Sequence, residues 1–362
     1  MKLLYIDPYP SWKLIVDDKI PTHHLFGMYD LIDSFHKDGK SIVGHLSKAI
    51  GGGEIHFYSA NERYYPFLKK ALLVFQRFYH MAKLVFVVKK YDVVYDNYYQ
   101  ITLFYGFLKK MGLYKKTKFI TVLHNPSYFK MALTLAGGAD AYIFLCTMHF
   151  DYAVHICPEV RDRCFLNEWY PDVERYSKYC NHVGKVSSEY FFIDNGITER
   201  DHELLFYVCA RNGIPTVISE RAAKNSNITI PDSVTLYSYN KINDENVMKL
   251  LISIKAIVIP LKHSLGMSAP YGITSFLDAI ALRIPVICSD NACFAPQIAD
   301  NKLGLIYKTS SADDLFDKMR MLYYDKVLYD ELKENMIDFS KNRTIKQTSK
   351  KLQDIIIDTM KR

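Results

Sequence analysis

The residues with the most evident chemistry lie between Pro270 and Asp290, where a glycine turn leads into a short helix and then a buried strand. Gly272 is expected to turn the chain, and the helix to begin near Thr274. Free N–H groups and the positive dipole end at a helix N-terminus form a natural phosphate site. Asp278 lies one turn further on, on the face that Thr274 shares, where its carboxylate can accept hydrogen bonds from ribose hydroxyls. The alternative is that Gly272 only turns the chain and Asp278 is solvated.

Short apolar runs that alternate with helix-length segments must position these groups. Strands alternating with helices favour parallel sheets built from βαβ units. The expected strands are Lys2–Ile6, Val93–Tyr95, Phe119–Leu123, Ala141–Leu145, Tyr190–Ile193, Thr216–Ile218, Ala256–Ile259 and Pro285–Cys288. The expected helices include Tyr65–Lys90, Arg200–Asn212, Asp244–Ile254 and Ser275–Leu282.

With 362 residues, the chain is longer than a single core usually supports, so two domains are expected. The polar stretch Glu174–Ser188 is interpreted as the linker between them. The amphipathic end of the chain is expected to form a helix that packs back across the domains. The predicted parts are an N-terminal domain over 1–175, a C-terminal domain over 176–343 and the terminal helix over 344–362.

Composition excludes several classes of protein. A hydrophobic share of 49% and a charged share of 23% are those of a globular chain. No apolar run approaches the ~18–20 residues of a membrane span, and the N-terminus does not resemble a signal peptide, so a cytoplasmic location is expected. The 7 cysteines include no Cys-x-x-Cys pair, which disfavours a disulfide framework or a zinc site. A P-loop, a Gly-x-Ser-x-Gly elbow and an Asp-x-Asp pair are also absent from the sequence.

The positive charge of the chain is concentrated in its first half. The whole chain carries a net charge of +7, and within 63–130 there are 13 basic and 2 acidic side chains, a net +11. This window is also rich in Phe and Tyr. We expect this region to face an anionic membrane surface, and the alternative is a buried helix with a solvated basic rim. Nucleic acid is not expected as a partner.

The segment from Asp278 to Ile287 resembles the C-terminal signature of retaining GT-B glycosyltransferases, family 4 in particular. Gly272-Ile273-Thr274 matches the Gly-x-Thr loop of many members, and Asp278 stands at the second glutamate of their Glu-x7-Glu pattern. Three departures are that the second glutamate is the shorter acid Asp278, that Pro270 stands at the first glutamate, and that Arg283 stands at a usual glycine. By the resemblance, the Gly-x-Thr loop binds the donor diphosphate and Asp278 binds the ribose.

The segment Tyr190–Asp201 resembles the first strand and glycine turn of the donor domain in the same family. Gly196 would form the turn, and Arg200 matches the cation that contacts the donor diphosphate. Ile197 stands where an arginine is common, and the turn is shorter than usual. An exposed arginine in the first turn of a helix is the alternative for Arg200.

Three segments of the first half also resemble the family. His124 follows an expected strand, where related transferases have a histidine that meets the donor sugar or the acceptor, although a lone histidine is often structural. The loop Pro21–Gly27, with His24 and Gly27, resembles an acceptor-side loop of one bacterial branch. Its alternative role is to cap a helix over Leu25–Phe35. The segment Trp169–Asp172 resembles a Trp-Gly-x-Asp hinge with tyrosine in place of the glycine.

The resemblance implies an α/β chain of GT-B type, with two doubly wound Rossmann-like domains. It implies transfer of a sugar from a nucleotide-diphosphate sugar to a glycan or lipid-linked acceptor, with retention, in cell-surface polysaccharide synthesis. The nucleotide sugar is a substrate, and no cofactor or metal is expected, since the helix dipole and cations stabilise the leaving diphosphate. The enzyme would be cytoplasmic and peripheral on the inner face of the membrane. The alternatives are a GT-B nucleotide-sugar epimerase and a catalytically degraded GT-B protein that acts as a binding partner.

Overall fold

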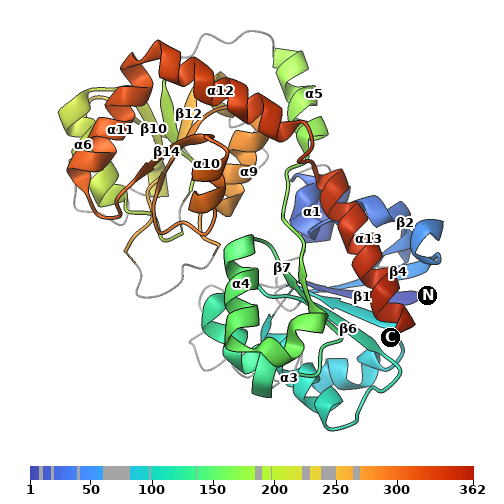
Figure 1. The fold of residues 1–362 in the computed structure, drawn as a ribbon. Helices are drawn as coiled ribbons and strands as arrows, with labels where there is room; N and C mark the ends of the chain where they lie inside the picture. Colours follow the sequence, from blue (N-terminus) through green and yellow to red (C-terminus); the bar gives the residue numbers. More distant parts are fainter. Residues whose placement is uncertain are drawn as a thin grey trace. The chain divides into compact units, whose positions relative to one another are not determined.

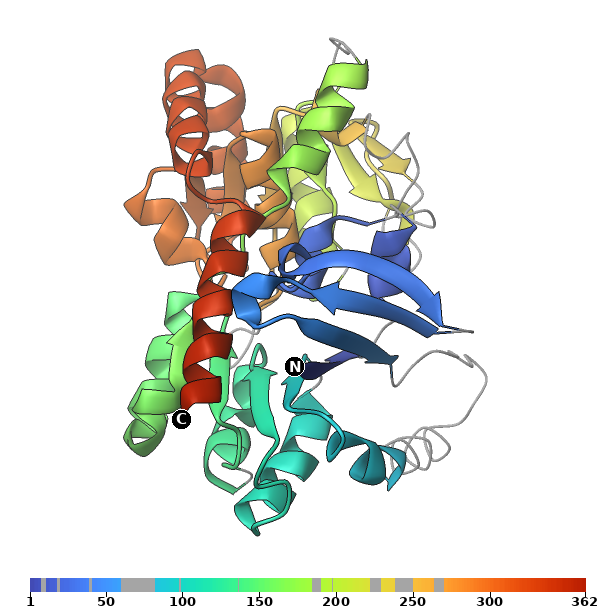
Figure 2. The same cartoon turned by 90° about the vertical axis from the view of Figure 1, so that its right-hand side faces the viewer.

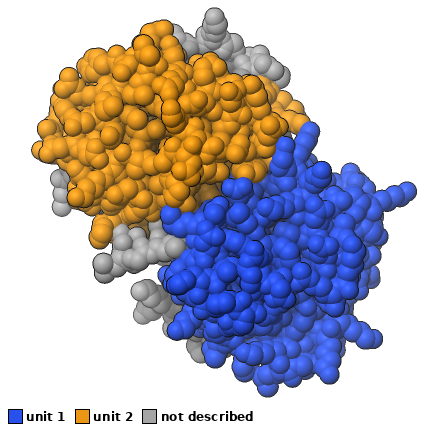
Figure 3. Space-filling view, in the orientation of Figure 1, with its two compact units in different colours: residues 1–169, 345–362 blue, residues 170–344 orange. Residues whose placement is uncertain are grey.

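The chain divides into two compact units, coloured separately in Figure 3. Unit 1 comprises Met1–Trp169 and Ile345–Arg362, and unit 2 comprises Tyr170–Thr344, so the division falls a few residues before the expected boundary at 175. The computed structural model describes residues 1–7, 11–17, 20–38, 41–59, 82–97, 99–135, 137–183, 190–196, 198–221, 229–237, 250–263 and 270–362. No helix in these ranges is long and apolar enough to cross a membrane.

Unit 1 is built on an eight-stranded sheet in the order β2-β3-β4-β1-β5-β6-β7-β8 (Figure 1). The strands from β4 to β8 are parallel neighbours, as βαβ units require, and they contain every strand expected in this half. The antiparallel edge formed by β2, β3 and β4 was not expected. The bounds are β1 Lys2–Asp7, β2 Ile32–Asp38, β3 Ser41–Leu46, β4 Gly53–Ser59, β5 Val93–Asp96, β6 Lys118–Val122, β7 Ala141–Phe144 and β8 Cys164–Leu166.

The alternative helix over Leu25–Phe35 is wrong. Short 3-10 turns occupy Thr22–Leu25 and Tyr29–Leu31, and strand β2 follows at once. The backbone of β2 pairs with β3, and the rings of His36 and His45 stack across the two strands with centroids 4.8 Å apart. Pairing along a whole strand outweighs the weak helical spacing of these residues.

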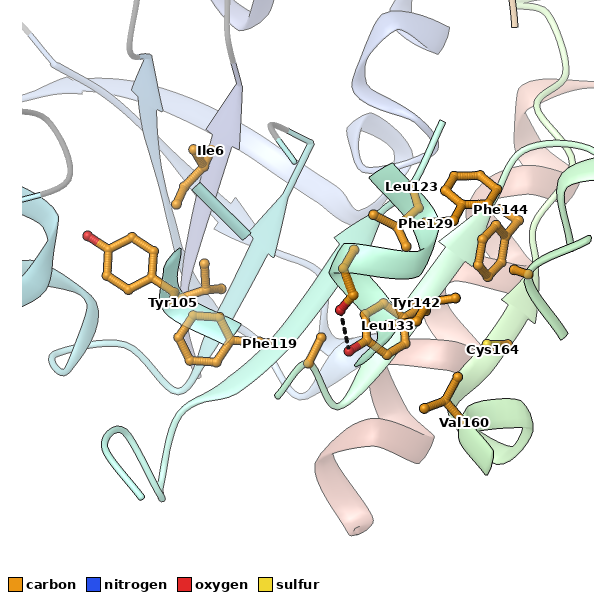
Figure 4. Packing of buried hydrophobic residues seen from close by; sticks show 14 of the residues in the cluster. Ile6, Tyr105, Phe119, Leu123, Phe129, Leu133, Tyr142, Phe144, Val160 and Cys164 are labelled. Atoms are coloured by element: carbon orange, nitrogen blue, oxygen red, sulfur yellow. Dashed lines mark hydrogen bonds between the residues drawn. The ribbon is translucent and has the colours of Figure 1, made fainter. Parts of the chain in front are cut away.

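The helices of unit 1 pack against the sheet, and the hydrophobic core contains side chains from both. They are α1 Ser11–Val16, α3 Tyr99–Lys110, α4 Thr147–Ile156 and α13 Ile345–Lys361, with a π-helical turn over Met131–Leu135. Of the helix expected over Tyr65–Lys90, residues 65–81 lie outside the described part, and 82–88 are helical. Leu84 and Val88, one turn apart, are buried with Phe119 and Phe129 in the aromatic core shown in Figure 4.

The C-terminal helix expected over 344–362 is confirmed as α13, and it belongs to unit 1 (Figure 2). Gly27, with a φ of +87°, faces this helix so closely that a Cβ would lie 3.1 Å from the Ser349 backbone. Thr348 Oγ1 donates a hydrogen bond to the Glu168 carbonyl at 2.9 Å. Ser349 Oγ lies 2.9 Å from Asp30 Oδ2. The helix therefore holds both the Gly27 loop and the end of the first part of unit 1.

Unit 2 is built on a six-stranded, wholly parallel sheet in the order β11-β10-β9-β12-β13-β14. The segment interpreted as a linker contains helix α5, Val173–Val183. The strands are β9 Phe192–Asp194, β10 Thr216–Ser219, β11 Val234–Tyr237, β12 Ala256–Ile259, β13 Val286–Ser289 and β14 Gly304–Tyr307. The helices are α5, α6 His202–Asn212, α9 Ile273–Leu282, α10 Ala295–Asp300, α11 Ala312–Tyr324 and α12 Lys326–Ser340.

Candidate functional site

The strand order of unit 2 reverses between β9 and β12. The sequence proceeds outward from β9 through β10 to β11 on one side, and from β12 through β13 to β14 on the other. Ligands of open α/β sheets bind outside the carboxyl ends of the strands at such a point. The turn after β9 and the chain between β12 and α9 both begin there, so the expected donor residues of this half gather at one place.

The phosphate site that the sequence predicts falls at the N-terminus of α9. Gly272 caps the helix with a φ of +82°, and a Cβ there would lie 2.6 Å from Ile259 Cγ2, so only glycine fits without strain. The Ile273 N–H donates to the Pro270 carbonyl at 3.2 Å, while Thr274 is exposed. The Phe276 N–H donates to the Gly272 carbonyl at 3.1 Å, which is the first hydrogen bond of the helix. The Thr274 and Ser275 amides precede it and lie at the positive end of the helix.

Arg200 is enclosed beneath this turn, with only 2% of its side chain exposed. Its Nε donates to Asp194 Oδ1 at 3.1 Å, and its Nη2 donates to Ser275 Oγ at 3.0 Å. A Cβ at Gly196 would overlap the guanidinium, and one at Gly272 would lie 3.2 Å from Nη1. The two glycines thus make room for a buried cation, in contrast to the exposed arginine considered as the alternative.

The partner of Arg200 is a fully buried carboxylate at the end of β9. Asp194 is 0% exposed, and it also accepts a hydrogen bond from the Gly196 N–H at 3.0 Å. Its second oxygen lies 3.2 Å from His202 Nε2. Asp194 was not singled out from the sequence, although a polar residue directly after an apolar strand was the available signal. The ion pair fixes the turn that carries Gly196.

Asp278 is held by two protein donors. The Tyr176 hydroxyl, on α5, donates to Oδ1, and Asn195 Nδ2 donates to Oδ2 at 2.5 Å. Burial raises the pKa of the Asp278 carboxyl to about 6, and the two hydrogen bonds act in the opposite direction. The carboxylate is therefore a fixed group that joins α9 to the turn after β9. Neither Tyr176 nor Asn195 was singled out from the sequence.

His124 follows β6 at the carboxyl edge of the unit 1 sheet, as expected from its position after a strand. The next residue, Asn125, accepts a hydrogen bond from the Ser127 N–H at 3.1 Å and thereby caps the short turn that follows. Burial, and to a smaller extent the neighbouring His149, lower the pKa of His124 to about 4. His124 is therefore neutral at physiological pH.

Further polar residues that the sequence analysis missed lie along the same edge. Asp7 ends β1 opposite Ser59, which ends β4, and Asp96 ends β5. These three and Asn97 are buried, with exposed fractions between 2% and 6%. Asp7, Asp96 and Asn97 end or follow apolar strands, whereas Ser59 ends the mixed strand β4. The carboxyl edge of unit 1 is therefore as polar as a ligand-binding edge should be.

The loop with His24 and Gly27 lies against Trp169 in unit 1. Trp169 Nε1 donates to the His23 carbonyl at 2.8 Å, and its ring lies 4.7 Å from that of Phe26. His24 contributes its ring to the same cluster, with its centroid 6.2 Å from that of Trp169. The structure thus places Gly196, Arg200, Gly272, Ile273, Thr274 and Asp278 in unit 2, and His24, Gly27 and His124 in unit 1.

Comparison with known proteins agrees with this reading of the fold. Residues 223–343, which include α9, match the family model described as glycosyl transferases group 1. No curated protein matches the chain significantly. Among solved structures, HepE of Anabaena in complex with UDP-glucose has a TM-score of 0.68 at 11% identity, over 98% of both chains. The sucrose-phosphate synthase of Thermosynechococcus elongatus has a TM-score of 0.69 at 12% identity, over 98% of both chains.

A third solved structure, the lipopolysaccharide outer core galactosyltransferase WaaB in its apo form, has a TM-score of 0.60 at 14% identity, over 99% of both chains. At these identities the structural matches establish the fold, which is GT-B, as the sequence motifs predict. Over 223–343, which contains the segment from Asp278 to Ile287, the model match confirms the family resemblance. The segments before residue 223 lie outside this match.

Replacing Arg200 with alanine should destabilise unit 2 strongly. The change leaves the Asp194 carboxylate buried without its cation, which typically costs about 3–5 kcal/mol. Urea unfolding followed by circular dichroism measures the loss. Arg211→Ala is the matched control, because Arg211 pairs with Asp313 at 2.7 Å on the surface, and it should barely move the midpoint. Equal midpoints for the two variants would contradict a structural role for the buried pair.

Replacing His124 with glutamine should reduce the sensitivity of unit 1 to acid. Because the pKa of His124 is lowered to about 4, the unfolded chain binds a proton there between about pH 6.5 and 4 and the folded chain does not. The free energy of unfolding therefore falls as the pH drops through this window, by at most about 3 kcal/mol from this group. Urea unfolding at pH 7 and 4.5, followed by tryptophan fluorescence, reports on unit 1, which contains both tryptophans.

The control for the histidine is His155→Gln on α4, where the side chain is exposed. This variant should lose as much stability on acidification as the wild type. If His124→Gln behaved in the same way, His124 would not be the group that titrates.

Proposed function

We propose that this GT-B protein, whose residues 223–343 match the group 1 glycosyltransferase model, transfers a hexose from a nucleotide-diphosphate sugar to a glycan or lipid-linked acceptor with retention. The observation that carries the proposal is the turn at Gly272. It combines a helix N-terminus whose N-cap residue is glycine, with no side chain to cap it, a buried cation beneath it and a carboxylate further along the same helix. All of these lie at the reversal of the strand order. Those are the groups that a nucleoside diphosphate needs.

Each expected residue then has a role in donor binding. The amides around Gly272, Ile273 and Thr274 would bind the diphosphate, with the dipole of α9 stabilising the charge that develops on it. Arg200 would add positive charge from below, and the Gly196 turn would face the same phosphates. Asp278 would accept hydrogen bonds from the ribose. No metal is needed for departure of the diphosphate in this scheme.

Unit 1 would supply the acceptor side. His124, which is neutral, would contact the transferred sugar as a hydrogen-bonding group, and the loop with His24 and Gly27 would line the acceptor. HepE of Anabaena was solved with UDP-glucose, so UDP and UDP-glucose are the first ligands to test. Incubation with the donor alone, with analysis for an epimerised sugar, separates transfer from epimerisation.

The acceptor class is supported by a surface of unit 1 that we call the α3 surface. It consists of five exposed large apolar side chains and four exposed lysines at the end of α3, the turn after it and the π-helical turn. These are Phe107, Met111, Leu113, Met131 and Leu135, with Lys110, Lys115, Lys116 and Lys130. Lys110 Nζ donates to the Thr134 carbonyl at 2.8 Å, which joins α3 to the π-helical turn. We propose that this surface docks on an anionic membrane, where a lipid-linked acceptor resides.

Lys109 is not part of the α3 surface. Its ammonium group forms an ion pair with Asp140 and donates to the Thr117 carbonyl at 2.6 Å, and 14% of its side chain is exposed. Burial lowers the pKa of Lys109 below its usual value. Lys109 therefore belongs to the fold, and variants that test the membrane must leave it in place.

Replacing Asp278 with asparagine should weaken binding of a nucleoside diphosphate by about ten- to a hundredfold, because a charge-assisted hydrogen bond contributes roughly 1.5–3 kcal/mol. A thermal-shift screen of UDP, GDP, ADP and dTDP identifies the nucleotide, and calorimetry then gives the affinity. Asp317→Asn is the control, since Asp317 is exposed on α11. An unchanged affinity for Asp278→Asn would remove Asp278 from the donor site.

Replacing Lys110, Lys115 and Lys116 together with serine should reduce binding to acidic vesicles by about a hundredfold, at roughly 1 kcal/mol for each basic residue. Flotation with phosphatidylcholine vesicles, with and without phosphatidylglycerol, measures the binding at low and high salt. The control replaces Lys302, Lys326 and Lys341 of unit 2, which are exposed and pair with acidic residues. Equal flotation with neutral and acidic vesicles at low salt would exclude docking through charge.

A further inference from the structure

The Asp278 carboxylate accepts hydrogen bonds from side chains of two other elements of unit 2. Tyr176, on α5, donates through its hydroxyl to Oδ1, and Asn195, in the turn after β9, donates through Nδ2 to Oδ2. Tyr176 is almost completely buried, with 3% exposed. Asp278 is intermediate in exposure as a whole residue.

The two donors leave the carboxylate able to accept more hydrogen bonds. An ionised carboxylate has about four lone-pair positions on its two oxygens. Tyr176 and Asn195 use one position on each oxygen, so one position on each oxygen is left. A pair of vicinal hydroxyls, such as the 2′ and 3′ hydroxyls of a ribose, matches two acceptors held side by side.

The same two donors favour the ionised form of the carboxyl, against the larger effect of burial. Burial acts against the charged form and raises the pKa of Asp278 to about 6, while the hydrogen bonds from Tyr176 and Asn195 lower it. Among the described residues, Asp172 and Arg175 act on Tyr176 in opposite directions, and no charged side chain acts on the carboxyl directly. A protonated Asp278 would donate one hydrogen bond and lose an acceptor.

We infer that Tyr176 and Asn195 are positioning residues, which hold Asp278 as an oriented, ionised acceptor for the ribose diol of the donor. The inference rests on the proposed function, since it adds a supporting pair to the proposed ribose contact. It also gives α5 a part in donor binding, although Tyr176 precedes Asp278 by 102 residues in the chain.

The test is the pH profile of nucleotide affinity for Tyr176→Phe, which removes one hydroxyl from a buried ring. Wild-type affinity should fall as the pH drops through the region near 6, where Asp278 takes up a proton. In Tyr176→Phe this fall should begin at higher pH, so that the affinity is about three- to tenfold weaker at pH 7 and close to wild type at pH 8.5. Calorimetry with the nucleotide found in the screen measures both profiles.

Two further variants make the readout specific. Asn195→Ser should move the profile in the same direction, and Tyr176→Phe should add no further loss in an Asp278→Asn background. Tyr207→Phe, an exposed tyrosine on α6, is the matched control and should leave the profile unchanged. A loss that is the same at every pH, or an unaltered affinity in Tyr176→Phe, would overturn the inference.

A second measurement needs no nucleotide. The carboxyl carbon resonance of Asp278, assigned by its absence in Asp278→Asn, should titrate at a pH higher by about one and a half to two units in Tyr176→Phe than in the wild type. An unmoved midpoint would overturn the inference. If no nucleotide stabilised the wild type while this midpoint did move, the donor site would fail and the positioning of the carboxylate would stand.

Discussion

The ion pair between Asp194 and Arg200 is the contact on which the architecture of the candidate site depends. A guanidinium this deeply buried is tolerated only where a carboxylate and further acceptors surround it, and Asp194 and Ser275 supply them. Because Gly196 and Gly272 both lie against it, one side chain sets the path of two turns that are far apart in the sequence. The turn at the start of α9 therefore lies directly over a buried ion pair.

The central strands of both sheets could be predicted, and the edge strands could not. Strands buried on both faces are continuous apolar runs, and each run that predicted a strand became one. The edge strands β2, β8, β11 and β14, with β3 and β4 beside one edge, were all missed. An edge strand meets solvent on one side, so its composition is mixed and its pairing partner, distant in the sequence, decides its conformation.

The site was predictable only where its residues are neighbours in the chain. Gly272, Ile273, Thr274 and Asp278 share one short segment, so their spacing on a helix is informative. Tyr176 and Asn195 reach Asp278 across 102 and 83 residues, and no local pattern reports such contacts. The burial of Arg200 was missed for the same reason, because it arises from the approach of α9. A polar residue at the end of an apolar strand, such as Asp194 or Asp7, could have predicted further residues of the sheet edges, and this pattern was not used.

The return of α13 to unit 1 has a consequence for how the chain folds during synthesis. Unit 2 is one continuous segment inserted between two parts of unit 1, so all of its residues emerge from the ribosome before unit 1 is complete. The loop at Gly27 cannot make its native contacts until α13 is synthesised, since it packs against that helix. The usual order, in which the N-terminal domain finishes first, is reversed. Until α13 is released, its buried apolar residues Leu352, Ile355 and Ile356 cannot pack against the rest of unit 1.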